Sequence, residues 1–107
     1  MGFFDRILNN NSVSSEKLKA MIANGAYLVD VRSSGEFSGG SGEGAVNIPL
    51  DQIANRTDEL KGKDSIVVFC RSGNRSGQAK SILEQKGFEN VINGGTWEQV
   101  NNLIQAL

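Results

Sequence analysis

The sequence contains no histidine and only one cysteine, Cys70, among its 107 residues. Without an imidazole, the chain alone cannot assemble a Cys–His pair or a Ser–His–Asp triad for nucleophilic catalysis. A single thiol also excludes an internal disulfide and a zinc finger, and we expect neither a metal site nor a cofactor. Any chemistry at Cys70 must therefore proceed without a histidine base.

Charge imbalance and long apolar runs are also missing. Lysine and arginine number 11 against 12 aspartate and glutamate, a net charge of -1, so there is no basic excess of the kind that binds nucleic acid or an anionic membrane. No stretch approaches the ~18 consecutive apolar residues of a membrane span, and the N-terminus does not resemble a signal peptide. We expect a cytoplasmic protein with no nucleic-acid and no membrane partner.

The composition, with 38% hydrophobic and 21% charged residues, is typical of one globular domain. We expect a polar N-terminal lead-in over residues 1–12 and a single domain over residues 13–107 that acts as a monomer. The apolar residues of Phe3–Leu8 have helical spacing, and the sequence leaves open whether they dock on the domain or on a partner.

Strand and helix patterns alternate along the domain. Strands are expected at 27–31, 45–48, 65–69 and 91–92. Helical segments are expected from a cap at Ser14 or Ser15 to Gly25, over 50–60, from Ser76 to Gly87, and after a cap at Thr96. A glycine-rich loop with at most one helical turn is expected at 35–44, and a turn at 93–95. Four consecutive apolar residues, 66–69, predict a strand buried on both faces. The alternation predicts an α/β fold, a small open, mostly parallel sheet with helices on both faces.

Cys70 lies where the most buried strand is expected to end, and ligands of open parallel sheets bind beyond such strand ends. A polar loop between a strand and a helix can direct backbone N–H groups at one centre, and the helix N-terminus adds positive potential. Such surroundings lower the pKa of a thiol, and Arg71 and Arg75 add positive charge. An inert, buried cysteine is the alternative, although a polar, doubly cationic loop is a poor cover for an apolar thiol.

The loop Cys70–Ser76 reads Cys-Arg-Ser-Gly-Asn-Arg-Ser. It resembles the active-site loop of rhodanese-like domains, in particular of single-domain, stand-alone sulfurtransferases. Further segments resemble motifs of the same family in the same order: Val29–Arg32 with Glu36 and Phe37, Gly44–Pro49, and Gly94 and Gly95 with Trp97. The chain departs from the family at Ser41-Gly42-Glu43, where members commonly have His-Ile-Pro.

The resemblance implies a sulfurtransferase that carries sulfane sulfur as a persulfide on Cys70. A small anionic donor such as thiosulfate would supply the sulfur, and a thiol or cyanide would accept it. Cys70 would be the catalytic nucleophile, and the substrate-binding residues would be Arg71, Ser72, Gly73, Asn74, Arg75 and Ser76. The arginines would bind donor oxygens, and the N–H groups of 71–75 would hold the persulfide sulfur. Gly73 would allow either a positive φ or a close approach of the backbone to the sulfur. Ser76 would cap the helix and donate to the sulfur.

Two of these loop residues have a purely structural alternative. Arg75 would then pair with a carboxylate of the scaffold, and Asn74 would only stabilise the turn. Asp30 and Arg32, at the end of an expected strand, are also expected to be scaffold residues that tie neighbouring loops together, because a buried aspartate without such a partner is costly.

Two other functions stay open. A sulfur-carrier or delivery module for a sulfur-relay protein partner would present an exposed apolar patch beside the loop. A cysteine-based phosphatase or arsenate-type enzyme is less favoured, because related phosphatases place five residues between cysteine and arginine, whereas four separate Cys70 from Arg75. The shorter loop suits a sulfur atom better than the larger phosphoryl group.

Overall fold

The computed structural model describes residues 14–107, so the expected lead-in and the Phe3–Leu8 segment lie outside the described residues. The elements in chain order are α2 (Ser15–Ala23), β1 (Tyr27–Asp30), α3 (Ser34–Ser38), β2 (Val46–Asn47), α4 (Leu50–Ile53), the 3-10 helix η1 (Thr57–Leu60), β3 (Ile66–Cys70), α5 (Asn74–Gln85), β4 (Val91–Thr96) and α6 (Trp97–Gln105). In this part of the chain, no helix is long and apolar enough to cross a membrane.

The four strands of the described residues form one parallel sheet in the order β2-β1-β3-β4, which confirms the predicted fold class. Parallel strands bring all their carboxyl ends to one edge of the sheet. Cys70, the last residue of β3, therefore lies beside the chain that leaves β1, where the Val31 N–H donates to the Phe69 carbonyl at 2.9 Å.

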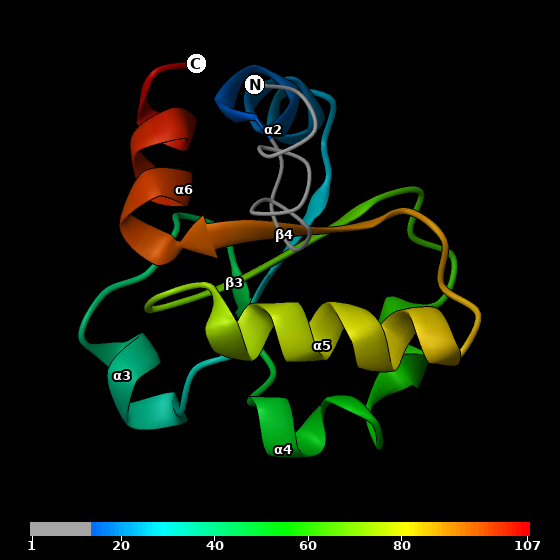
Figure 1. Ribbon diagram of the computed structural model, residues 1–107. Coiled ribbons are helices and arrows are strands. Elements are labelled where there is room, and N and C mark those ends of the chain that lie inside the picture. Colours follow the sequence, from blue (N-terminus) through cyan, green and yellow to red (C-terminus); the bar gives the residue numbers. More distant parts are fainter. Residues whose placement is uncertain (1–13) are drawn as a thin grey trace, which may run out of the picture.

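The central strand β3 separates two apolar layers, as its uninterrupted apolar run predicted. All of its residues are buried, and alternate side chains point to opposite faces. Val68 and Cys70 belong to the cluster that includes residues of α4 and α5, whereas Val67 and Phe69 belong to the cluster with α2 and α6. Figure 1 shows these two pairs of helices on opposite sides of the sheet. The alternation of the strand thus places the Cys70 side chain on the α5 face.

Two helix starts follow the predicted caps. The Ser14 hydroxyl accepts from the Lys17 N–H at 3.3 Å at the start of α2, and the Thr96 hydroxyl accepts from the Gln99 N–H at 3.2 Å at the start of α6. Each such bond satisfies a backbone donor that the helix leaves unpaired, and caps of this kind contribute about 1 kcal/mol.

The start of α5 differs from the prediction. The helix begins at Asn74 rather than Ser76, and its N-cap is Gly73 in the left-handed conformation with φ 97°. The prediction that Ser76 caps the helix is therefore wrong, because Ser76 lies inside the first turn. Gly73, whose positive φ was predicted, lets the chain reverse direction within three residues of the strand end.

The segment Asn93-Gly94-Gly95 was predicted as a turn and is part of β4 instead. Asn93 is opposite Val68 and Gly95 is opposite Phe69, so Gly94 is an extra residue in a β-bulge. Glycine-rich sequences are usual in turns, but here pairing with β3 continues to Thr96. The glycine at 94 is required by packing, because an added Cβ would lie 2.8 Å from Val67 and 3.0 Å from Val100.

The glycine-rich segment after β1 contains the short helix α3, which starts one residue before the expected loop. Ser33 and Glu36 form a capping box there, in which the Glu36 N–H donates to the Ser33 hydroxyl at 3.3 Å and the Ser33 N–H donates to Glu36 Oε1 at 3.1 Å. This pairing fixes the Glu36 side chain near the end of β1.

Asp30 and Arg32 form a buried ion pair, which confirms their predicted scaffold role. Asp30 is 0% exposed and Arg32 4%, and Arg32 Nη2 donates to Asp30 Oδ2 at 2.7 Å. Arg32 also donates to the Gly40 carbonyl, and the Ser41 hydroxyl donates to Asp30 Oδ2 at 2.7 Å. The pair therefore ties the end of β1 to the segment in which the chain departs from the family pattern.

Replacing Gly94 with alanine tests the bulge. We expect Gly94→Ala to lower the free energy of unfolding by about 2 kcal/mol, because the new methyl group overpacks the layer beside Val67 and Val100. The matched control is Gly35→Ala in α3, where a Cβ meets nothing within 4 Å and the change should stay within about 0.5 kcal/mol. Urea unfolding followed by Trp97 fluorescence measures both, and equal stability of the two variants would contradict the packing explanation.

Candidate active site

Cys70 ends the central strand β3, and its Sγ is in contact with Ser76 in the first turn of α5. The residue is buried, with 0% relative exposure. The loop that leads from it to the helix is polar, and Arg71 and Ser72 on this loop are exposed. The thiol thus sits beneath a short solvent-facing loop.

Three hydrogen-bonding groups converge on the sulfur atom of Cys70. The Gly73 N–H donates to Sγ at 3.0 Å, the Ser76 N–H donates to it at 3.4 Å, and the Ser76 hydroxyl lies 3.4 Å from it. The two amides point at Sγ because Gly73 turns the chain directly into the helix, whose first N–H groups have no partner within the helix.

These contacts decide the ionisation of the thiol. Burial raises the pKa of Cys70, but hydrogen bonds from the Ser76 hydroxyl and from the amides of Ser76, Ser72 and Gly73 oppose it, and the net effect lowers the pKa below its ordinary value. Hydrogen bonds to the charged form favour that form. The loop therefore stabilises a thiolate without a histidine, through amides and one hydroxyl.

A buried asparagine supports this loop from β4. Asn93 Oδ1 accepts from the Ser76 hydroxyl at 2.7 Å and from the Gly95 N–H at 2.9 Å, and Asn93 Nδ2 donates to the Gly73 carbonyl at 2.9 Å. Asn93 was not predicted as a site residue, because it was assigned to a turn. A polar side chain directly after the apolar pair Val91 and Ile92 was the available signal.

Arg75 is bound to a carboxylate. Its Nη1 donates to Glu36 Oε1 at 2.8 Å and its Nη2 donates to Glu36 Oε2 at 3.0 Å, a two-bond pair between residues far apart in sequence. The Arg75 guanidinium, together with the Ser33 amide, holds the pKa of Glu36 at about 2. Arg75 thus forms the pair with a carboxylate that was given above as its structural alternative.

The remaining predicted loop residues are at the surface. Arg71, Ser72 and Asn74 are exposed, and the Asn74 N–H donates to the Ser72 hydroxyl at 3.4 Å. Within residues 14–107, Arg71 forms no ion pair. Its guanidinium is therefore available to an anion in a way that the Arg75 guanidinium is not.

Across the same residues, no group of three or more histidine, cysteine, aspartate or glutamate side chains could hold a metal ion.

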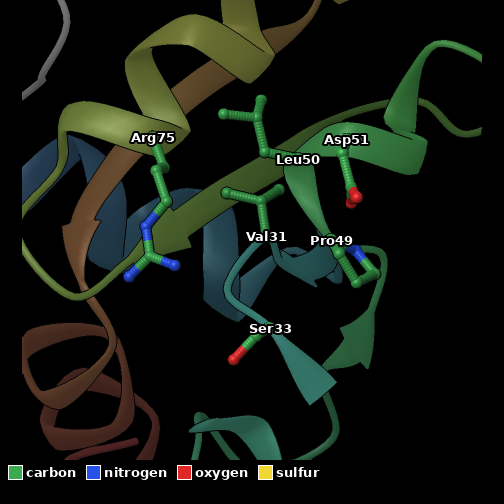
Figure 2. A pocket seen from close by; sticks show the side chains of 6 residues that line it. All are labelled: Val31, Ser33, Pro49, Leu50, Asp51 and Arg75. Carbon is green, nitrogen blue, oxygen red and sulfur yellow. The ribbon is translucent and has the colours of Figure 1, made fainter. Parts of the chain in front are cut away.

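An open pocket of about 430 Å³ lies next to this loop. Its lining residues are Val31, Ser33, Pro49, Leu50, Asp51 and Arg75. Figure 2 shows the Arg75 side chain extending from α5 toward Ser33, on the side of the pocket opposite Asp51. Glu36 already neutralises Arg75, whereas the exposed Asp51 carboxylate forms no ion pair with the residues that the structure describes. The pocket is therefore a poor site for an anion.

The comparisons with known proteins place the fold in a family. A family model described as the rhodanese-like domain matches residues 14–99. Thiosulfate sulfurtransferase PspE of Escherichia coli is 38% identical over 71 residues, which cover 64% of this chain and 68% of that protein. The human single-domain sulfurtransferase TSTD1 superposes with a TM-score of 0.70 at 27% identity, over 83% of this chain and 93% of the other.

A relative of Bacillus subtilis, the uncharacterized protein YqhL, is 38% identical over 68 residues. The aligned part covers 64% of this chain and only 54% of YqhL, so this chain spans about half the length of that relative. The family match nevertheless includes the whole sheet and the cysteine loop. The chain belongs to the rhodanese-like domain family.

Proposed function

We propose that this protein is a thiosulfate sulfurtransferase that moves sulfane sulfur through a persulfide on Cys70. The observation that carries the proposal is the convergence of the Gly73 and Ser76 donors on Cys70 Sγ. Relatives named as sulfurtransferases support the reaction class, and PspE supports thiosulfate as the donor. The substrates are a small sulfur-donating anion and a thiophilic acceptor such as cyanide or a thiol.

The reaction consists of two displacements at sulfur. The Cys70 thiolate attacks the outer sulfur of thiosulfate, so that a new S–S bond forms while the bond to the sulfonate sulfur breaks and sulfite leaves with the electron pair. The acceptor, cyanide or a thiolate, then attacks the outer sulfur of the persulfide, and the Cys70 thiolate leaves. Atoms and charge balance in both steps, and a covalent relay of this kind gives ping-pong kinetics.

The donors on Sγ serve both displacements. In the first step they keep the thiol ionised, and in the second step they stabilise the same thiolate as the leaving group, whose departure is faster when its pKa is low. When the persulfide is present, the negative charge moves to the outer sulfur, and N–H groups of residues 71–75 would stabilise it there. No step requires a general base.

We assign donor recognition to Arg71. It is exposed, next to Cys70 and free of ion pairs within residues 14–107, whereas Glu36 occupies both terminal nitrogens of Arg75. An arginine can bind two oxygens of a sulfonate at once. Thiosulfate would therefore approach the loop from the Arg71 side rather than from the pocket beside Asp51.

The alternative functions receive less support. A sulfur-delivery module was expected to show an apolar patch beside the loop, but among residues 14–107 the exposed large hydrophobic side chain is Leu107, behind α6. In the related phosphatases the arginine that ends the loop binds the phosphoryl oxygens, and here the arginine in that place, Arg75, is paired with Glu36.

Mass spectrometry after incubation with thiosulfate tests the persulfide. We expect the protein to gain the mass of one sulfur atom on Cys70 and to lose it again when cyanide is added. Cys70→Ser should gain nothing while remaining folded, because the serine hydroxyl occupies nearly the same volume and can accept the same N–H groups. Sulfur that stays on the Cys70→Ser variant, or a wild-type protein that gains none, would contradict the proposal.

Steady-state kinetics tests Arg71. We expect Arg71→Ala to raise the KM for thiosulfate about tenfold, the loss of roughly 1.4 kcal/mol from a charge-assisted contact, with a smaller effect on kcat. The matched control is Lys61→Ala, which removes the same charge from an exposed side chain before β3, at the edge of the sheet opposite Cys70. A KM unchanged by Arg71→Ala, or raised equally by the control, would place donor recognition elsewhere.

The ion pair of Arg75 predicts a pH dependence of stability. The pKa of Glu36 in the folded protein is about 2, below its ordinary value of 4.5, so the pair stabilises fully above about pH 4.5 and its contribution is lost as the pH falls through about 2. We expect Glu36→Gln to be less stable than the wild type at pH 7, with a difference that shrinks below pH 4.5. The control Glu89→Gln changes an exposed carboxylate that forms no ion pair with any other residue of 14–107, and it should match the wild type throughout. A difference independent of pH would contradict the assignment.

A further inference from the structure

Asn93 is a buried polar side chain in a mostly apolar strand, and the two displacements proposed above do not use it directly. It is 2% exposed and lies on the same face of the sheet as Cys70, because alternation from Val91 in β4 points it toward α5. All of its polar atoms are bonded: two donors reach Oδ1 and the Gly73 carbonyl accepts from Nδ2.

The Ser76 hydroxyl lies between Asn93 and Cys70 and has one hydrogen for two acceptors. It donates to Asn93 Oδ1 at 2.7 Å, and the Cys70 sulfur is 3.4 Å away on the other side. With a protonated thiol, the S–H group can donate to the Ser76 oxygen while the hydroxyl donates to Asn93. With a thiolate, the sulfur is a second acceptor for this hydrogen, so Asn93 Oδ1 and Cys70 Sγ compete for it, while Asn93 Oδ1 keeps the Gly95 N–H in either case.

The second contact of Asn93 acts on the turn. Its Nδ2 donates to the carbonyl of Gly73, the residue whose N–H makes the shortest contact to Cys70 Sγ. Asn93 therefore holds both sides of the sulfur, the hydroxyl through Oδ1 and the left-handed turn through Nδ2. The Gly95 N–H in turn fixes which end of the amide faces Ser76, because only an oxygen can accept it.

We propose that Asn93 is a positioning residue that sets the ionisation and leaving ability of Cys70 by holding the Ser76 hydroxyl and the Gly73 turn. The inference rests on the proposed function for its effect on sulfur transfer. Its effect on the thiol itself is independent of any donor, since it follows from the contacts within the loop and β4.

The test is the pH dependence of the alkylation of Cys70 by iodoacetamide. The signal comes from Cys70 because the chain has one cysteine, and it reports the ionised form because the thiolate is the nucleophile. The variant Asn93→Asp keeps the shape and both Oδ1 contacts, loses the donor to the Gly73 carbonyl, and adds a negative charge behind Ser76. We expect the midpoint of alkylation to move to higher pH by about one unit, a tenfold loss of thiolate at pH below the midpoint. A wild-type midpoint in this variant would overturn the inference.

The control Asn90→Asp makes the same substitution at the other end of β4, where Asn90 Nδ2 donates to the Asp64 carbonyl at the edge opposite Cys70. It should leave the midpoint unchanged, and an equal shift in both variants would overturn the inference by showing a general effect of charge. If Asn93→Asp fails to fold, the midpoint of alkylation is measured in Ser76→Ala instead. It removes the hydroxyl while Gly95 still satisfies Asn93, and it should also raise the midpoint.

The combination Ser76→Ala with Asn93→Asp separates positioning from simple charge. If Asn93 acts in part through Ser76, the two shifts are smaller together than their sum, and full additivity would overturn that route. In the sulfur-transfer assay, Asn93→Asp should lower kcat with little change in the KM for thiosulfate. If the wild type forms no persulfide, the proposed function fails, whereas the alkylation profile still decides the role of Asn93.

Discussion

The arrangement around Cys70 depends on the left-handed conformation of one residue, Gly73. With φ at 97°, this glycine ends the connection after β3 and starts α5 at Asn74, so that the first helix amides face the sulfur instead of solvent. An L-residue with a side chain adopts this conformation at a cost. A later helix start would leave the same amides too far along the chain to reach Sγ, and the buried thiol would then be an ordinary apolar side chain.

Hydrogen bonds from buried polar side chains stabilise the turn at Gly73 and the loops beside it. In the described part of the chain no buried side-chain nitrogen or oxygen lacks a partner. Asn93 ties the turn to β4, and the Asp30–Arg32 pair ties the end of β1 to Gly40 and Ser41. A buried polar group without a partner costs a few kcal/mol, so these contacts stabilise the loops at the carboxyl edge of the sheet in the observed arrangement.

Features that depend on a local residue pattern were predicted from the sequence. Features that depend on contacts between strands and helices far apart in the sequence were missed. The apolar run 66–69 identified the central strand, and its end located Cys70. The bulge that makes Asn93 part of β4 could not be predicted, because Asn-Gly-Gly favours a turn until a neighbouring strand pairs with it. Glu36 was equally hidden as the partner of Arg75, since only the fold brings the end of β1 beside the start of α5. The sequence raised a carboxylate partner for Arg75 as an alternative, but it could not identify that partner as Glu36.

Transfer of sulfane sulfur does not need a histidine, whereas most hydrolytic reactions need an acid or a base of that kind. Acyl and phosphoryl transfer to water must activate a nucleophile and protonate a leaving group, and a positioned acid or base usually does both. Displacement at the outer sulfur of thiosulfate moves an electron pair between atoms that are stable as anions, namely a thiolate, sulfite and a persulfide. Preorganised N–H groups stabilise such charge without taking up a proton. The proposed transfer therefore needs only backbone amides, one hydroxyl and an exposed arginine around the thiolate, and the loop from Cys70 to Ser76 contains all of them.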